Sequence, residues 1–404
     1  MKTIKRIVLG ALLLVVLVGV VGWFTLDKEA RALLKTMPTN RDLLFWNQAQ
    51  RDAAFRAMDR IALLAKWHSI APSSTPRVLP PGPPLQLDID VDAYMAGQRS
   101  AALLILRRGQ LRLERYGLGF DGADGQQRWT SFSVAKSFTS TLVGAALRDG
   151  AIRSMDDKVS DYIAGLKGSA YDAVSVRQLL TMTSGVQWNE DYADPQSDVA
   201  RFNNHKPKPG EDALISYLRE LPRIAPAGER WNYSTGETNL IGILVTQATG
   251  KPLAQYLQEK IWQPAGMQYP ATWLLSKTGQ EISGCCLQAA PRDFARFGQF
   301  ILEGAQVGGA AGAGKPTVPD GWLQAATHKE ADIGVPGRGY GYQWWTYDDG
   351  SFTARGIFGQ GIFIDPQRQL VIVSNANWEG GARDPNAMAA RDAFYQAVQR
   401  AVDK

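Results

Sequence analysis

A serine and a lysine three residues apart are the first residues in this chain that could do chemistry together. In Ser133-Val-Ala-Lys136, a helix would place both side chains on one face. A lysine amine kept neutral by desolvation or by a positive neighbour can accept the serine proton. Ser133 also stands at the predicted start of a helix, where free N–H groups favour the negative charge that develops in acyl transfer. The pattern predicts a serine nucleophile with a lysine base.

The tetrapeptide alone has a simpler interpretation. On the order of one S-x-x-K is expected by chance in a chain this long, and Ser133 can be a helix cap beside a solvated Lys136. The surroundings favour chemistry, because Phe132 and Phe138 flank the motif and a buried lysine requires a partner or a function.

Tyr233 is the second candidate, in Trp231-Asn232-Tyr233-Ser234-Thr235-Gly236. This segment lies just ahead of a helix predicted over 236–249. A phenol there can relay protons between nucleophile and leaving group, and packing against Trp231 explains the residue equally well. No G-x-S-x-G motif occurs, which argues against a conventional Ser-His-Asp hydrolase.

The composition excludes several other functions. The 404 residues carry a net charge of +5 with no basic block, so nucleic-acid binding is not expected. The histidines His68, His205 and His328 are isolated, and no metal site is predicted. Cys285 and Cys286 are adjacent, a poor arrangement for an unstrained disulfide, and we expect two small buried apolar side chains.

The N-terminal residues have the pattern of a membrane anchor. Lys2, Lys5 and Arg6 precede an uncharged run from Ile7 to Leu26, long enough to cross a bilayer core of about 30 Å. The preceding charges favour a cytoplasmic N-terminus, and no clear A-x-A cleavage site follows, so an uncleaved anchor is preferred over a removed signal peptide. In a bacterium, residues 1–27 would anchor the chain in the inner membrane, with the remainder in the periplasm.

The rest divides into an arm and a catalytic region. Residues 28–70 look helical, and the proline-rich residues 71–84 should be extended, so 28–84 forms a helical stalk or arm with a linker. Residues 85–404 form the catalytic region. A β-hairpin (101–106 and 111–116) opens it, and helices are predicted over 133–147, 175–183, 236–249, 252–265 and 291–303. Strands follow at 340–347, 352–354, 361–365 and 370–374, then a helix at 386–402. This order predicts an α+β fold, with one antiparallel sheet closed by both ends and a helical domain inserted between them.

Taken in order, these motifs resemble the serine β-lactamase and penicillin-binding-protein superfamily. The similarity covers about residues 85–400 and is strongest to the class C-like branch, which includes D-alanyl-D-alanine carboxypeptidases, esterases and 6-aminohexanoate-dimer hydrolases. The segments that carry it are 133–136, 233–235, 176–185, 292–298 and a glycine-containing strand near the C-terminus. The resemblance implies a β-lactamase-like fold and a covalent acyl-enzyme on Ser133, with Lys136 and Tyr233 sharing the proton relay. It implies no metal or organic cofactor, and a small amide, ester or peptide-like substrate.

The resemblance also indicates where the family's third motif and the substrate contacts lie. The family's third motif matches Lys277-Thr278-Gly279 literally, but its position points instead to Ala354-Arg355-Gly356. By resemblance, the N–H groups of Ser133 and Ile357 form the oxyanion hole, Gly356 lets substrate approach, and Arg355 supplies a cation. Tyr192 is the candidate for contact with the scissile amide, or else a loop-anchoring aromatic.

Two departures disfavour β-lactam hydrolysis. Thr235 stands where asparagine is usual, and the third motif has lost its lysine or histidine. We therefore expect an amidase or esterase. A cell-wall D,D-peptidase, penicillin-binding protein or β-lactamase is the alternative enzyme, and an inactive anchored binding module is the alternative of another class.

Overall fold

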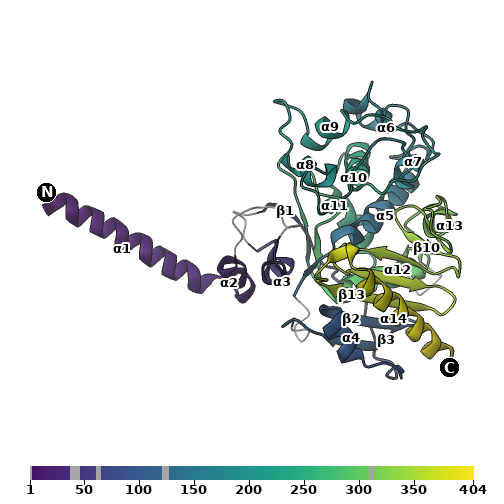
Figure 1. The fold of residues 1–404 in the computed structure, drawn as a ribbon, viewed down its shortest axis with the longest axis horizontal. Helices are drawn as coiled ribbons and strands as arrows, with labels where there is room; N and C mark the ends of the chain where they lie inside the picture. Colours follow the sequence, from purple (N-terminus) through teal and green to yellow (C-terminus); the bar gives the residue numbers. More distant parts are fainter. Residues whose placement is uncertain (1, 37–45, 61–64, 121–126, 309–313) are drawn as a thin grey trace.

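The computed structural model describes residues 2–36, 46–60, 65–120, 127–308 and 314–404 (Figure 1). An isolated N-terminal helix, α1 (Lys2–Thr25), extends away from the rest of the molecule. Its segment Ile4–Thr25 is long and apolar enough to cross a membrane, a property that signal sequences share.

A seven-stranded antiparallel sheet forms the centre of the fold, in the order β3-β2-β13-β12-β11-β10-β9. Its strands come from both ends of the catalytic region, as predicted. They are β2 (Ser100–Arg107), β3 (Gln110–Tyr116), β9 (Arg338–Tyr340), β10 (Trp345–Tyr347), β11 (Phe352–Arg355), β12 (Gly361–Asp365) and β13 (Leu370–Ala376).

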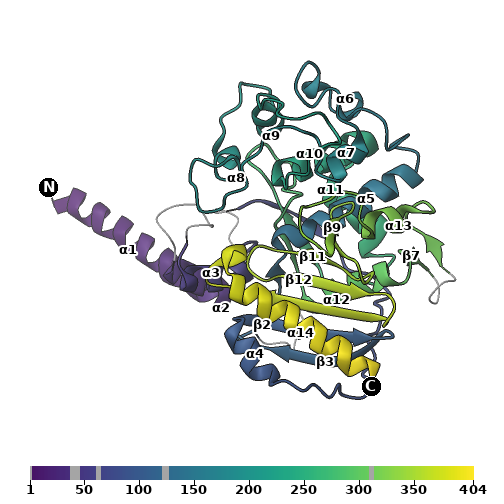
Figure 2. The same cartoon turned by 45° about the vertical axis from the view of Figure 1, so that its right-hand side comes forward.

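Helices cover both faces of this sheet (Figure 2). Side chains of β2 point alternately to its two faces. Leu103 and Ile105 pack under α4 (Val91–Gly97) and α14 (Pro385–Asp403), while Leu104 and Leu106 belong to the larger core with α12 (Pro291–Leu302). Burial on both faces explains why β2 reads as a continuous apolar run rather than an alternating one.

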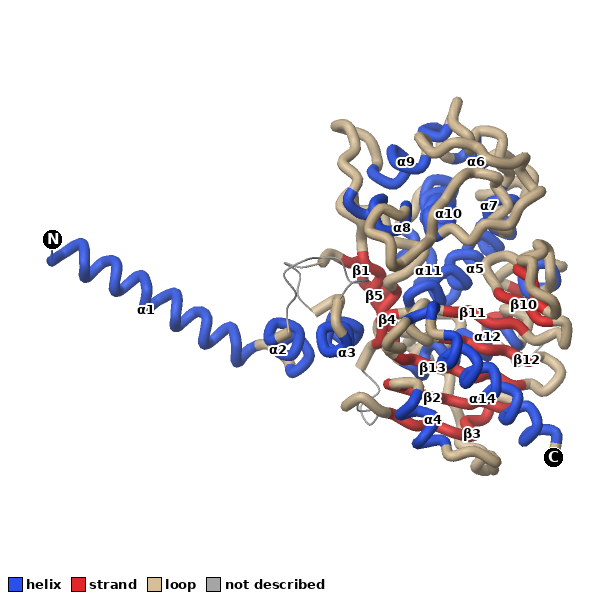
Figure 3. Tube along the Cα trace, in the orientation of Figure 1, coloured by secondary structure: helices blue, strands red, loops and turns tan. Residues whose placement is uncertain are grey.

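The helical region is inserted along the chain between the N-terminal and C-terminal strands, and it lies to one side of the sheet (Figure 3). Its central helices are α5 (Ala135–Arg148) and α10 (Thr235–Thr249), which pack on each other. The shorter helices are α6 (Val159–Tyr162), α7 (Val176–Leu180), α8 (Asp198–Arg201), α9 (Ala213–Leu218), α11 (Leu253–Leu257) and α13 (Trp322–Thr327). This arrangement confirms the predicted α+β fold.

A second, four-stranded sheet was not predicted. Its order is β1-β5-β6-β4, with β1 (Trp67–Ile70), β5 (Ala271–Leu274), β6 (Leu287–Ala289) and β4 (Trp129–Thr130). The expectation of helix throughout 28–70 is therefore wrong at its end, because β1 pairs with β5, some two hundred residues further along the chain.

The N-terminal arm packs against the catalytic region. It contains α2 (Lys28–Lys35) and α3 (Gln48–Ala57). The fully buried Phe55 of α3 contacts the rings of Trp129, Phe132 and Phe358, with centroids 5.6, 4.8 and 5.3 Å away. Residues 71–84 contain no helix and follow the domain surface in extended form, with a bridge from Pro81 to Leu111.

Candidate active site

Ser133 lies two residues before α5, in a constrained 3-10 turn formed by Phe132–Val134. The backbone of Ser131 donates to the Leu287 carbonyl (2.9 Å), and the Leu287 N–H donates to Ser131 Oγ (3.0 Å). Phe132 then adopts a φ of +42°, a left-handed conformation that costs a non-glycine residue of order 1–3 kcal/mol and is held only where packing enforces it. Here the rings of Phe55 and Phe358 enclose Phe132. The turn leaves Ser133 partly exposed in a cavity.

Lys136 is the most deeply buried cation of the site, with 1% of its surface exposed. Its Nζ donates to Thr235 Oγ1 over 2.9 Å and lies 5.3 Å from the centroid of the Tyr233 ring. Burial lowers the pKa of this amine to about 8, against an opposing effect of the Glu190 carboxylate. A neutral amine is thus accessible near physiological pH, as a general base requires.

Glu190 connects the polar groups of the site. The sequence did not indicate this role. Its carboxylate accepts hydrogen bonds from the Tyr192 hydroxyl (2.5 Å), the Thr235 N–H (3.0 Å), the Thr235 hydroxyl and the Trp188 indole N–H. The Thr235 hydroxyl has one proton, which it donates to Glu190, and so it accepts from Lys136. A hydrogen-bonded chain therefore runs from Lys136 through Thr235 to Glu190.

Tyr233 directs its hydroxyl to the same point, where the Ser133 side chain lies close enough to act on the pKa of the phenol. Burial, reinforced by Glu190, raises the pKa of Tyr233, so the phenol is protonated at neutral pH. The ring stacks on Trp345 at 5.5 Å. The preceding residue is fixed by a backbone hydrogen bond from Asn232 to Met182 (2.9 Å). Ser133, Lys136 and Tyr233, separated by up to a hundred residues, thus converge.

The end of β11 adjoins this group. Gly356 donates to the Gln360 carbonyl (2.8 Å), and a Cβ atom on Gly356 would lie 2.5 Å from Gln360 Oε1 and 3.0 Å from the Ser131 carbonyl. Only glycine lets this turn pack so closely beside Ser131. The next residue, Ile357, lines the same cavity as Ser133, together with Tyr192.

Arg355 lies apart from this cavity. Its guanidinium donates to the Tyr347 hydroxyl, packs over the Trp345 ring at 5.4 Å, and lies 3.9 Å from Asp392 on α14. It does not line the cavity that holds Ser133.

The cavity at Ser133 has a volume of about 540 Å³ and a mainly apolar wall. We call it the main cavity. Beyond the residues already named, its apolar lining is Met58, Phe132, Val199, Ala200, Phe202, Ala213, Leu214, Leu274, Leu275 and Ile282. Lys277, in the literal Lys-Thr-Gly match, is an exposed turn residue as expected, and lies at the rim.

Two cysteines in the cavity wall correct a prediction. Cys285 and Cys286 form a disulfide, so the expectation of two separate apolar thiols is wrong. The turn that holds them is fixed from both sides, because the Trp273 indole donates to the Cys285 carbonyl (2.9 Å) and Leu274 N–H to the Cys286 carbonyl (3.1 Å). Gly284, just before the pair, would place a Cβ 3.0 Å from Lys136 Nζ.

Each of the three histidines has a hydrogen-bond partner outside the group formed by Ser133, Lys136 and Tyr233. His68 contacts Glu281 (2.8 Å), His205 contacts Ser216 (3.0 Å) and His328 contacts the Gln324 carbonyl (2.9 Å). Within the described part of the chain, no three His, Cys, Asp or Glu side chains gather into a metal site.

This chain is similar to several known proteins. The profile of the Beta-lactamase family matches residues 87–397. The 6-aminohexanoate-dimer hydrolase of Paenarthrobacter ureafaciens is 29% identical over 305 residues, which cover 72% of this chain and 75% of that protein. Esterase EstB of Burkholderia gladioli is 25% identical over 377 residues, covering 77% and 94%.

The fold is shared with solved structures. A provisionally named 6-aminohexanoate-dimer hydrolase from Bacillus anthracis superposes with a TM-score of 0.74 at 22% identity, covering 87% of this chain and 94% of that one. The family match spans most of the chain, and the relatives include hydrolases and esterases. The chain therefore belongs to the Beta-lactamase family and is a serine hydrolase of that family.

Proposed function

We propose that this protein hydrolyses small amides or esters through an acyl-enzyme on Ser133, in the manner of the 6-aminohexanoate-dimer hydrolases it resembles. The observation that supports this most is the convergence of three groups. The Ser133 side chain lies beside the protonated phenol of Tyr233, and the buried amine of Lys136, with a pKa of about 8, lies over the same ring.

The first half-reaction forms the ester. Ser133 Oγ attacks the substrate carbonyl carbon as its proton passes to the neutral Lys136 amine. The N–H groups of Ser133 and Ile357 stabilise the resulting oxyanion. Tyr233 then gives its proton to the leaving amine or alcohol and regains one from Lys136, so the carbon–heteroatom bond breaks without a charge left on the leaving group.

The second half-reaction reverses these roles. A water molecule attacks the acyl carbonyl, its proton passes through the Tyr233 and Lys136 pair, and Ser133 is released with its proton restored. Tyr192 donates a hydrogen bond to Glu190 and lines the main cavity, and we place the scissile group of the substrate beside it. We propose that Arg355 acts electrostatically on the end of β11 and does not contact the substrate directly.

The apolar main cavity and the replacement of asparagine by Thr235 favour linear amides and esters over β-lactams. A cell-wall D,D-peptidase or penicillin-binding protein is the second candidate, supported by the family membership and by the N-terminal helix α1. We further propose that residues 1–27 anchor the protein in a bacterial inner membrane. Residues 28–84 then form an arm and linker, and the hydrolase domain 85–404 lies in the periplasm.

The test is a substrate screen on protein beginning at residue 28. We expect turnover of short-chain 4-nitrophenyl esters or small linear amides, and little turnover of the chromogenic β-lactam nitrocefin. Lys136→Ala should abolish activity, and Tyr233→Phe should reduce turnover by about 100-fold, with melting temperatures near wild type. Nitrocefin turnover exceeding that of every ester and amide would contradict the substrate class.

A further inference from the structure

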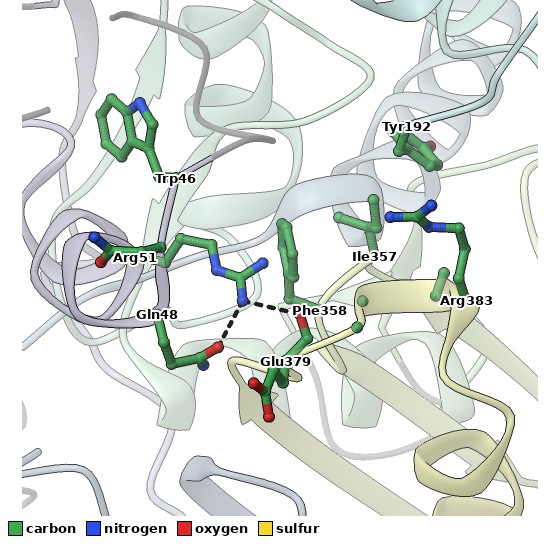
Figure 4. A pocket seen from close by; sticks show the side chains of 12 residues that line it. Trp46, Gln48, Arg51, Tyr192, Ile357, Phe358, Glu379 and Arg383 are labelled. Carbon is green, nitrogen blue, oxygen red and sulfur yellow. Dashed lines mark hydrogen bonds between the residues drawn. The ribbon is translucent and has the colours of Figure 1, made fainter. Parts of the chain in front are cut away.

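The Cys285–Cys286 disulfide lies in the wall of the main cavity, which also contains Ser133. Cys285 is partly exposed, and Cys286 is nearly buried. A second cavity of about 350 Å³ meets the main one at Tyr192 and Ile357, and neither cysteine lines it (Figure 4). The disulfide therefore belongs to the cavity of the proposed nucleophile, and the proposed mechanism gives it no role.

The backbone just before the disulfide covers the amine of Lys136. A Cβ atom on Gly284 would lie 2.8 Å from Thr235 Cγ2 and 3.0 Å from Lys136 Nζ, so the Gly284 backbone packs directly on both side chains. The Gly284 N–H donates to the side chain of Asn239 on α10 (3.0 Å), which fixes the backbone in this place. The contact contributes to the burial of Lys136 and keeps water from its amine.

The backbone just after the disulfide holds the turn that presents Ser133. Leu287, the residue after Cys286, exchanges two hydrogen bonds with Ser131. Cys286 itself has a φ of +70°, a conformation that residues other than glycine rarely adopt. A disulfide between adjacent residues closes a small ring through the peptide bond that links them, and so restricts the backbone there. Opening this ring would free Cys286 to leave its conformation and would loosen the backbone on both sides.

We propose that the Cys285–Cys286 disulfide is a positioning element of the active site, which keeps the Gly284 backbone closed over Lys136, and that its reduction to two thiols slows turnover. A dithiol reductant breaks the S–S bond, supplies two electrons and two protons, and is itself oxidised to a disulfide. The chain contains two cysteines in all, so a reductant changes this pair alone. The inference rests on the proposed function, in which Lys136 is the base.

Reduction should move the acid limb of the pH–rate profile to higher pH. When water reaches Lys136, burial disfavours the charged amine less, and its pKa rises from about 8 toward the usual lysine value. The titratable groups that face this amine, Glu190 and Tyr233, stay in place, and a thiolate formed at the pair would act in the same direction. A rise of about one in this pKa lowers the neutral fraction at pH 7 from roughly 10% to roughly 1%.

The experiment compares oxidised protein with protein reduced by dithiothreitol and then separated from it in the absence of oxygen. Both kcat and KM for a 4-nitrophenyl ester are measured between pH 5.5 and 9, with a thiol titration and a thermal melt of each sample. Reduced protein should show two thiols, a higher acid-limb midpoint and about tenfold lower kcat/KM at pH 7. The loss should fall on kcat, and reoxidation should restore it. An unchanged midpoint in folded, reduced protein would overturn the proposal.

A variant and a second measurement complete the test. The double variant Cys285→Ser, Cys286→Ser should have the raised midpoint without reductant and should not respond to dithiothreitol, and a wild-type midpoint in that folded variant would count against the proposal. Acetic anhydride at pH 9 should acetylate Lys136 faster in reduced than in oxidised protein, as followed by peptide mass spectrometry. Because this labelling needs no turnover, failure of the proposed hydrolysis appears separately, as protein in which reduction exposes Lys136 while neither form cleaves the ester.

Discussion

Replacing Glu190 by glutamine is expected to move the acid limb of the pH–rate profile to lower pH. In the proposed mechanism the activity depends on a neutral Lys136 amine, whose pKa burial lowers to about 8 despite the opposing effect of the Glu190 carboxylate. Activity is therefore present above that pKa and is lost as the pH falls through it. Without the carboxylate, the charged amine is less stable, and the neutral form persists to lower pH.

The hydrogen bonds reinforce this direction. In the wild type, the Thr235 hydroxyl donates to Glu190 and accepts from Lys136. A glutamine amide can donate to that hydroxyl instead, and its carbonyl can accept from the Thr235 N–H and the Trp188 indole. The Thr235 hydroxyl then donates its proton to Lys136, and only a neutral amine can accept this hydrogen bond. The substitution is close to isosteric, so the fold should be preserved.

The size of the effect follows from how close the charges are. Glu190 is one hydroxyl away from Lys136, and an opposite charge within about 4–6 Å typically shifts a pKa by 1–3. With a pKa of about 8, roughly 1% of the amine is neutral at pH 6. A downward shift of about one would raise this to roughly 10%, so activity at pH 6 relative to the plateau should rise about tenfold.

The assay is kcat/KM for a 4-nitrophenyl ester between pH 5.5 and 9, corrected for spontaneous hydrolysis. Glu220→Gln, an exposed glutamate on the surface of the helical region, is the matched control and should leave the midpoint in place. An acid limb that stays put or moves upward in Glu190→Gln would refute the electrostatic reasoning.

Three further predictions test the surroundings of the site. Phe55→Ala should destabilise the fold by about 3–5 kcal/mol and also lower kcat of the folded protein, because Phe55 supports the residues next to Ser133 and Ile357. Phe394→Ala, at a nearly fully buried position of α14, should lower the melting temperature alone, and equal losses of kcat in both variants would count against that supporting role. Denatured protein should show no reactive thiol before reduction and two afterwards, whereas two thiols without reductant would exclude the Cys285–Cys286 disulfide. Full-length protein should remain with membranes through an alkaline carbonate wash, and a mature N-terminus beyond residue 20 would show cleavage instead.

Local sequence patterns predicted the parts of the fold that depend on residues close together in the sequence. Apolar runs gave the β2–β3 hairpin, and the helices predicted over 236–249 and 291–303 agree with α10 and α12 to within one residue at each end. The segment 340–347 was expected as one strand and is instead split between β9 and β10. Between them, Gln343 has a φ of +63° and its buried side chain bonds to Thr238 (2.7 Å) and the Leu180 carbonyl (2.7 Å). Such distant partners leave no local signal.

The same distinction between local patterns and distant partners applies to the candidate active site. Ser133, Lys136 and Tyr233 could be chosen from motif spacing and resemblance, and the structure brings them together. Glu190 lies two residues before the candidate Tyr192, but its role depends on Thr235, 45 residues away. Arg355 was chosen for its charge and position, and its side chain direction is set by Tyr347 and Asp392.

Covalent labelling of Ser133 tests the proposed mechanism most directly. Wild-type protein treated with a fluorophosphonate should lose activity as one adduct forms, and peptide mass spectrometry should place that adduct on Ser133. Ser133→Ala should take up no label and show no turnover while melting as the wild type does. An adduct on another residue, or full activity in Ser133→Ala, would contradict the assignment of the nucleophile, and a folded wild type that takes up no label would favour the binding module instead.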